Sequence, residues 1–305
     1  MGLPEHDRFA SKLGKKPFLV TMEVNPPKGT DLSEIVRAVE RMKGLVDAIN
    51  VTDGSGAIMR ACSLAVAKVV LDAGVDPILQ MTCRDRNRLA LQADLLGAAI
   101  FGIRNVLLLT GDDPKSGDHP DAKPVFDITS ATLMQVAQGL TEGKDMAGQS
   151  LSGSPRFCIG AAADPGAKDL DAEMQKFQAK IGGGAAFFQT QAVFDPAKLR
   201  EFMKRVRAVA PSALHKPVLA GILLVKSAKM ARYMNEHVWG IHVPEEIIAR
   251  FEPASDTRAE CLAVTVELIR AVRNVADGIH LYALGWEDLV PDILREAKLE
   301  TVKRS

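Results

Sequence analysis

The sequence predicts an α/β fold, most simply a single closed (β/α)8 TIM barrel. Eight short apolar runs recur along the 305 residues, each followed by a turn and a segment with helical periodicity. The runs are apolar throughout and do not alternate, as expected of parallel strands buried on both faces. Eight such units in a chain of this length favour a closed barrel, with an open doubly wound sheet as the second choice.

The predicted strands are the eight apolar runs, which in chain order are Phe18–Val24, Ala48–Thr52, Pro77–Thr82, Val106–Thr110, Phe157–Ala162, Ala186–Thr190, Pro217–Leu224 and Ile279–Leu284. Apolar residues spaced three and four apart predict helices between and beside these runs. The predicted helices are Leu32–Lys43, Ile58–Asp72, Arg86–Phe101, Thr132–Gln138, Ala172–Ile181, Pro196–Val209, Ala228–Glu236 and Thr257–Val275. All belong to one predicted barrel domain, residues 1–305, with a short polar extension at residues 1–16.

Local signals mark two helix starts, two loops and one helix end. Residues 30–34 (TDLSE) offer a capping residue and an early acid, and Asp195-Pro196 places an acceptor at the cap and proline at the first helical position. Segments 111–131 and 139–155 lack strong periodicity and are predicted loops, of a length typical of functional or mobile segments. The glycines at 182–184 favour a helix end over a phosphate-binding loop, because they match neither common nucleotide-binding pattern.

Composition excludes several classes of protein. The 38 Lys and Arg balance 38 Asp and Glu, which argues against a nucleic-acid binder, and 15 aromatic residues are few for stacking single-stranded bases. No apolar run is long enough to span a membrane, and residues 1–16 are polar and basic, so we expect a cytoplasmic protein without membrane partners. The four cysteines lie far apart, form no zinc or redox motif, and are expected to be buried thiols.

Polar residues gather at the carboxyl ends of the predicted strands, where a barrel carries its active site. They include few carboxylates and no histidine, so neither a hydrolytic zinc site nor a serine nucleophile is indicated. Such a rim suits a large planar cofactor together with a heterocyclic substrate. Its members are Glu23, Thr52-Asp53, Thr82, Thr110-Gly111-Asp112, Asp164 and Gln189-Thr190-Gln191.

Each leading residue also has a plain structural interpretation. Glu23 could be an ordinary strand-end acid paired with a lysine, and Asp112 in TGDDP could be a turn former. Gln191 could be a satisfied loop amide, and the run Cys83–Arg88 is typical of a solvated helix start. On the residues alone these alternatives stay open.

The segments at these strand ends occur in the order and spacing of a known family, and the likeness covers nearly the whole chain. The segments are residues 22–27 (MEVNPP), 81–83 (MTC), 109–112 (LTGD), 184–195 (GAAFFQTQAVFD) and 221–223 (GIL). The sequence thereby resembles the methylenetetrahydrofolate reductase family. Residues 79–112, together with the segment 139–155, look most like the branch associated with corrinoid and homocysteine methyltransferase modules.

The resemblance implies a barrel with non-covalent FAD at its C-terminal mouth, which exchanges hydride with 5,10-methylenetetrahydrofolate to give 5-methyltetrahydrofolate. By this resemblance Glu23 is the acid that opens the methylene bridge, Asp112 binds the amino edge of the pterin, and Gln191 contacts the substrate. The cofactor-binding positions that it implies are Ser63, Gln80, Thr82, Thr110, Gly111, Asp112, Asp127, Ala163 and Lys180. No metal is implied.

Several positions depart from the best-known bacterial members. Gln80 replaces a histidine, Thr110 an arginine, Ala163 a tyrosine, Ala228 a phenylalanine and Trp286 an arginine at the folate tail. These departures leave the electron donor open between NADH, NADPH and a protein partner. The alternative is a flavin-bearing subunit of a larger redox assembly, as a homo-oligomer or with a partner subunit. A folate-binding scaffold without flavin is a third possibility.

Overall fold

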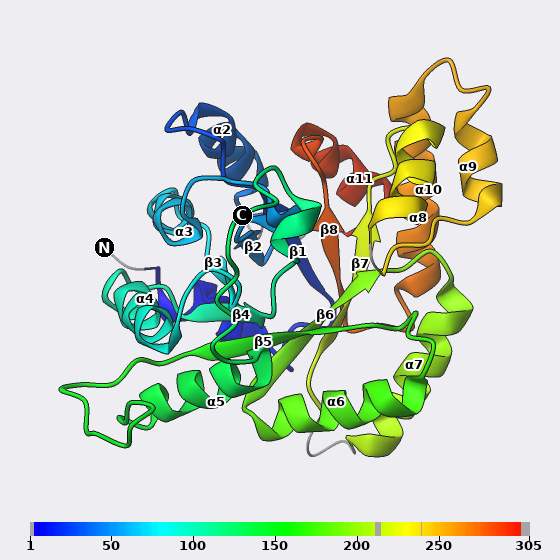
Figure 1. Cartoon of the computed structure of the whole chain (residues 1–305). Helices are drawn as coiled ribbons and strands as arrows, with labels where there is room; N and C mark the ends of the chain where they lie inside the picture. Colours follow the sequence, from blue (N-terminus) through cyan, green and yellow to red (C-terminus); the bar gives the residue numbers. More distant parts are fainter. Residues whose placement is uncertain (1–2, 211–214, 239, 300–305) are drawn as a thin grey trace.

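The computed structural model describes residues 3–210, 215–238 and 240–299, and it confirms the closed (β/α)8 barrel (Figure 1). The ends of the predicted domain, residues 1–2 and 300–305, lie outside the described residues. Eight parallel strands pair in chain order, and the last closes onto the first. They are β1 Leu19–Val24, β2 Ala48–Val51, β3 Pro77–Thr82, β4 Asn105–Leu109, β5 Cys158–Ala163, β6 Ala185–Ala192, β7 Val218–Leu223 and β8 Gly278–Tyr282.

Helices surround the strands, as Figure 1 shows. The α-helices are α1 Phe9–Lys12, α2 Ser33–Met42, α3 Ser63–Asp72, α4 Arg88–Ile100, α5 Ser130–Thr141, α6 Leu170–Gly182, α7 Pro196–Val209, α8 Ala228–His237, α9 Glu245–Phe251, α10 Thr257–Val272 and α11 Val290–Glu296. Short 3-10 helices are η1 Glu5–Asp7, η2 Ser55–Ala57, η3 Pro114–Ser116 and η5 Glu287–Leu289. Sequence periodicity predicts each long helix and misses the seven-residue helices α9 and α11.

Several predicted boundaries are wrong. The helix predicted from Ile58 begins at Ser63, because Met59 N–H donates to Asp118 Oδ1 (2.9 Å) and Ala61 N–H to a carbonyl outside the helix. The last strand ends at Tyr282, two residues early, since Leu284 takes a left-handed backbone conformation (φ +52°). Helix α5 is longer than predicted at both ends, so the second predicted loop starts after Thr141.

The local signals are confirmed at α7 and at the end of α6. Asp195 Oδ1 accepts from Ala197 N–H (2.8 Å) and caps α7, with Pro196 at its first position. At α2 the N-cap residue is Leu32, which makes no side-chain capping bond, and Asp31 Oδ1 accepts from the N–H of Ser33, the first residue of the helix (2.9 Å). The glycines at 182–184 close α6, and Gly184 has a φ of +94°.

The N-terminal end of the barrel is sealed by the segment that precedes β1. Phe9 is fully buried there, and its ring meets that of Phe187 edge to face with centroids 5.0 Å apart. The Asp76 carboxylate accepts from Phe9 N–H (2.8 Å), Arg8 Nη1 (2.9 Å) and Asn105 Nδ2 (2.7 Å). An apolar plug and a satisfied buried carboxylate therefore close this end.

The cysteines are free, and three of the four are buried as predicted. Cys62, which directly precedes α3, is exposed, so the prediction is wrong for that residue. Within the described part of the chain, no helix has the length and apolar character needed to cross a membrane.

Candidate active site

The parallel strands bring the predicted catalytic and substrate residues to one end of the barrel. Glu23 is the penultimate residue of β1 and pairs in register with Asn50 of β2. Gln191 is the penultimate residue of β6, and Asp112 follows β4. All three belong to the C-terminal mouth, where barrel active sites lie.

Glu23 is 7 % exposed, and a histidine lies beside it. Its Oε2 lies 3.6 Å from Nε2 of His280, which sits in β8 and is also buried. The described residues place no lysine in an ion pair with Glu23, so the interpretation as a lysine-paired strand-end acid is not supported. Tyr282 packs edge to face on His280 (4.7 Å), and burial, with Glu23 nearby, raises the pKa of its hydroxyl.

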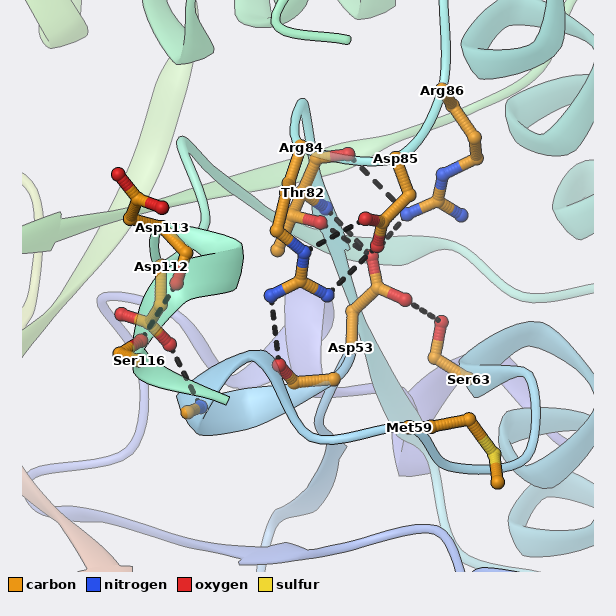
Figure 2. Close-up of polar contacts among 12 residues, drawn as sticks. Asp53, Met59, Ser63, Thr82, Arg84, Asp85, Arg86, Asp112, Asp113 and Ser116 are labelled. Atoms are coloured by element: carbon orange, nitrogen blue, oxygen red, sulfur yellow. Dashed lines mark hydrogen bonds and ion pairs between the residues drawn. The ribbon is translucent and has the colours of Figure 1, made fainter. Parts of the chain in front are cut away.

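Asp53, which follows β2, is the centre of a second polar cluster at the mouth (Figure 2). Its Oδ2 accepts from the N–H (2.8 Å) and the hydroxyl (3.1 Å) of Thr82, and its Oδ1 from the hydroxyl of Ser63 (3.2 Å). Arg86 forms an ion pair with the same carboxylate. Two predicted cofactor residues, Ser63 and Thr82, are thus brought together through an aspartate.

Arg84 and Arg86 are not solvated, which corrects the interpretation of Cys83–Arg88 as a solvated helix start for these two residues, whereas Arg88 at the start of α4 is exposed. Arg84 is 6 % exposed, donates to the Gly54 carbonyl (2.9 Å) and pairs with Asp85 through two hydrogen bonds (2.7 and 2.8 Å). Arg86 is held between Asp53 and Asp94. Arginine is buried where carboxylates pair with its guanidinium. Here they are the adjacent Asp85 for Arg84, and Asp94 of α4 with Asp53 after β2 for Arg86.

The loop after β4 is fastened onto η2. Asp112 Oδ2 accepts from Gly56 N–H (2.8 Å), while the residue itself is exposed. Gly117 passes so close to η2 that a Cβ there would lie 1.9 Å from the carbonyl oxygen of Ala57. Asp112 therefore does hold loop geometry, as the turn interpretation expects, and also presents its carboxyl group at the mouth.

The other predicted cofactor residues near β3 and β4 have separate partners. Gln80 is buried in β3 opposite Leu107, and the Thr110 hydroxyl lies 3.2 Å from that of Ser130. Gly111 has a φ of +95°. Asp127 accepts two hydrogen bonds from the Arg88 guanidinium and one from its N–H, which lower the pKa of Asp127 to about 2.

A cavity of about 910 Å³ opens between the β5 and β6 ends and the segment before α9. Basic and acidic side chains line it, namely Asp164, Glu173, Lys176, Lys198 and His242. Ala163 directly precedes this lining in β5. Lys180 Nζ donates to the Ala162 carbonyl (2.7 Å), and burial lowers the pKa of its ammonium group. Gln191 lies beside the cavity, since a Cβ on the lining residue Gly240 would sit 3.4 Å from its Cγ.

Trp286 stands at the position where the resemblance implies an arginine, and two cationic side chains lie against its ring. Lys226 Nζ is 5.1 Å and Arg258 Cζ 4.9 Å from the indole ring. Positive charge is therefore present at this position, carried by other side chains. The described residues hold no group of three His, Cys, Asp or Glu arranged to bind a metal ion.

Together these features define a (β/α)8-barrel protein whose C-terminal mouth combines a buried acid, hydrogen-bonding side chains and basic residues, with a large cavity at the β5 and β6 ends. The family model for methylenetetrahydrofolate reductase matches residues 8–298, and the chain belongs to that family. Its assignment to the branch with methyltransferase modules stays a prediction.

Individual relatives are distant. Methylenetetrahydrofolate reductase 1 of Schizosaccharomyces pombe is 24 % identical over 301 residues, covering 93 % of this chain and 47 % of the relative. The 5,10-methylenetetrahydrofolate reductase of Pectobacterium carotovorum is 24 % identical over 282 residues, covering 88 % and 87 %. This chain thus spans slightly less than half the length of several eukaryotic relatives.

A solved structure shares the fold. An uncharacterized protein from Clostridium thermocellum, described as binding two copies of 5-methyl-5,6,7,8-tetrahydrofolic acid, superposes with a TM-score of 0.61. Its sequence identity is 14 %, over 94 % of this chain and 96 % of that one.

Sequence reasoning missed two residues that organise the mouth. His280 lies inside an apolar run and contacts Glu23 only because β8 closes onto β1. His280 and Tyr282 are two residues apart and therefore lie on the same face of the strand, and this spacing is the signal that could have indicated them. Asp53 was noted as a strand-end residue, but its partners come from β3, α3 and the β3–α4 loop and could not be assigned from spacing.

Proposed function

We propose that this chain reduces 5,10-methylenetetrahydrofolate to 5-methyltetrahydrofolate with FAD as its cofactor. The observation that carries the proposal is Glu23, a buried carboxyl group at the barrel mouth in a chain of this family. The family relationship supports the reaction. The Clostridium thermocellum protein, which shares the fold, is described as binding a reduced folate, and this supports a folate as the substrate.

The mouth has room for a large cofactor. The 910 Å³ cavity is near the upper end of the size range for ligand sites, and its lining carries basic residues, among them Lys176, Lys198 and His242, beside the acids Asp164, Asp169, Glu173 and Asp195. Ammonium and imidazole groups are suitable partners for a diphosphate. Lys180 and Ala163 adjoin the cavity, so we assign them to the cofactor, together with the mouth residues Ser63, Gln80, Thr82, Thr110, Gly111 and Asp127. FAD, when bound, supplies the hydride.

This chain's own residues would supply the proton and hold the folate in place. Glu23 would hold a proton and deliver it to a nitrogen of the methylene bridge as the bridge opens. Asp112 keeps Oδ2 on Gly56 N–H, so its Oδ1 is the oxygen we assign to the amino edge of the pterin. Gln191 would add an amide contact beside the cavity.

The test is an anaerobic assay of the purified chain with FAD and methylenetetrahydrofolate. Electrons are supplied in parallel by NADH, by NADPH and by chemical reduction of the flavin, and 5-methyltetrahydrofolate is measured by mass spectrometry. Product in the chemically reduced arm is expected, and the nicotinamide arms identify the donor. A chain that binds FAD and methylenetetrahydrofolate but makes no product in any arm would contradict the proposal.

A further inference from the structure

A chain of buried polar side chains crosses the barrel interior and ends at Glu23. It comprises Asn50 of β2, Gln189 of β6, Thr21 of β1 and His280 of β8, all of them buried. Asn50 Nδ2 donates to Gln189 Oε1 (2.7 Å), and Gln189 Nε2 donates back to Asn50 Oδ1 (3.1 Å). Buried polar groups are costly unless every member finds a partner, so such a chain holds its members in fixed orientations.

Gln189 carries the polar chain from Asn50 to the histidine. Its Nε2, besides bonding Asn50, lies 3.1 Å from Thr21 Oγ1 and 3.3 Å from His280 Nδ1. Thr21 Oγ1 is 2.9 Å from His280 Nδ1 and 3.4 Å from the Ile279 carbonyl. An amide nitrogen can only donate, and the contact of the Thr21 hydroxyl to Nδ1 is the shorter of its two. We therefore assign Nδ1 of His280 as the acceptor, which places the ring proton on Nε2.

Nε2 is the ring nitrogen that lies 3.6 Å from Glu23 Oε2, a separation longer than a hydrogen bond, so the two groups are neighbours without a direct bond in this structure. Tyr282 packs edge to face on the imidazole, and its hydroxyl donates to the Thr190 carbonyl (2.8 Å). The titratable side chains shown against the His280 ring are thus Glu23 and Tyr282.

A glycine makes room for this arrangement. A Cβ on Gly221 would stand 2.8 Å from Tyr282 Cε2, so glycine lets the tyrosine ring lie beside the histidine. Gly221 N–H also donates to Thr190 Oγ1 (2.9 Å). This bond holds the end of β6, where the Thr190 carbonyl accepts from the Tyr282 hydroxyl.

We propose that His280 is a positioning residue for Glu23: its neutral Nε2–H tautomer, set by Thr21 and Gln189, orients the carboxyl group for proton delivery to the folate. This inference rests on the proposed function, in which Glu23 is the acid. His280 acts through Glu23 and has no assigned contact with substrate or cofactor. The Asn50–Gln189 pair has the role of fixing the tautomer.

The first test reads the tautomer directly on the whole chain without substrate. Protein labelled with ¹⁵N at histidine is examined by two-bond ¹H–¹⁵N correlation at pH 7, and the His280 signals are assigned by their loss in His280→Gln. The expected spectrum has a protonated Nε2 and an unprotonated Nδ1. A proton on Nδ1 would overturn the proposal whatever the activity of the enzyme.

The second test uses two substitutions that keep different halves of the ring. The amide nitrogen of glutamine can replace Nε2–H, whereas the shorter asparagine reaches only the Nδ1 position. The folate half-reaction, followed from pre-reduced enzyme, should be about 10-fold to 100-fold slower in His280→Asn, less than the ~10²–10⁴ that an acid contributes. His280→Gln should recover most of the rate.

Flavin reduction by the donor serves as the internal control and should be unchanged in both variants. Equal rates in His280→Asn and His280→Gln, or equal losses in both half-reactions, would overturn the positioning role. Normal folate turnover in Glu23→Gln would instead show that the proposed function of Glu23 fails, which keeps the two failures apart.

Discussion

The two ends of the barrel each hold an aspartate surrounded by arginine and hydrogen-bond donors, yet they are built for different tasks. Asp76, before β3, is fully enclosed with Arg8, the Phe9 amide and Asn105. Asp53, after β2, binds Thr82, Ser63 and Arg86 in much the same way. Asp53 remains partly exposed and lines a cavity of about 310 Å³.

The difference shows how one chemical arrangement can serve stability or binding. At the closed end Phe9 fills the barrel, so the carboxylate has no access to a ligand and its bonds contribute only to folding. At the open end the same kind of cluster lies beside a cavity that Asp53 itself lines. Barrels generally separate these tasks between their two ends. The following predictions test whether that separation holds here.

The largest effect is expected from Asp76→Ala. The substitution leaves Arg8 buried without its partner and removes the acceptor of the Phe9 amide and of Asn105. Breaking a buried ion pair costs about 3–5 kcal/mol of unfolding free energy. Chemical denaturation measures it, and FAD affinity of the folded fraction should match that of the parent chain. A loss below about 1 kcal/mol would mean that the closed end is not a stability element.

Asp53→Asn should have a smaller effect on folding and a distinct effect on binding. Asparagine keeps the shape, but it weakens the contacts to Arg86 and to Thr82. We expect a loss of about 1–3 kcal/mol in stability and a fall in FAD affinity of about tenfold. Isothermal titration measures the affinity, with Asp76→Asn as the matched control at the other end. Unchanged affinity in Asp53→Asn would separate this cluster from the ligand site.

The smallest effect concerns thiol reactivity. Burial raises the pKa of Cys83 to about 11, of Cys158 to about 12 and of Cys261 to about 11, whereas Cys62 is exposed. The thiolate is the reactive form, so at pH 8 a thiol reagent should label only Cys62 in the folded chain. All four should react in denaturant. Rapid labelling of Cys158, which packs in the closed end, would contradict the sealing of that end.

The same shifts have a consequence for stability. The unfolded chain ionises these thiols near the ordinary value of 9.0, before the folded chain does. Their stabilising contribution is therefore complete below pH 9 and is lost as pH rises toward 11.

Much of the fold could be predicted because its signals are local. Apolar runs defined all eight strands, and Asp195-Pro196 marked the start of α7. Ser63 as a helix start could not be found, because the preceding residues continue the apolar spacing and are held out of the helix by Asp118 and by a carbonyl of another loop.

The candidate site was predicted only as far as strand ends allow. Glu23, Asp112 and Gln191 follow from their positions on strands and from family resemblance. The contact between Glu23 and His280 depends on ring closure between β1 and β8. The burial of Arg84 and Arg86 depends on Gly54 and Asp53, which follow β2 and are distant in sequence, so spacing alone predicts solvent exposure for both arginines.

The central claim is that Glu23 at the open end is the acid of a flavin-dependent folate reduction. Glu23→Gln, compared with the parent chain in separate half-reactions, tests it most directly. The account predicts that FAD binding and flavin reduction are unchanged, while transfer to methylenetetrahydrofolate slows by about 10²–10⁴. Equal losses in both half-reactions, or a normal folate half-reaction, would contradict it.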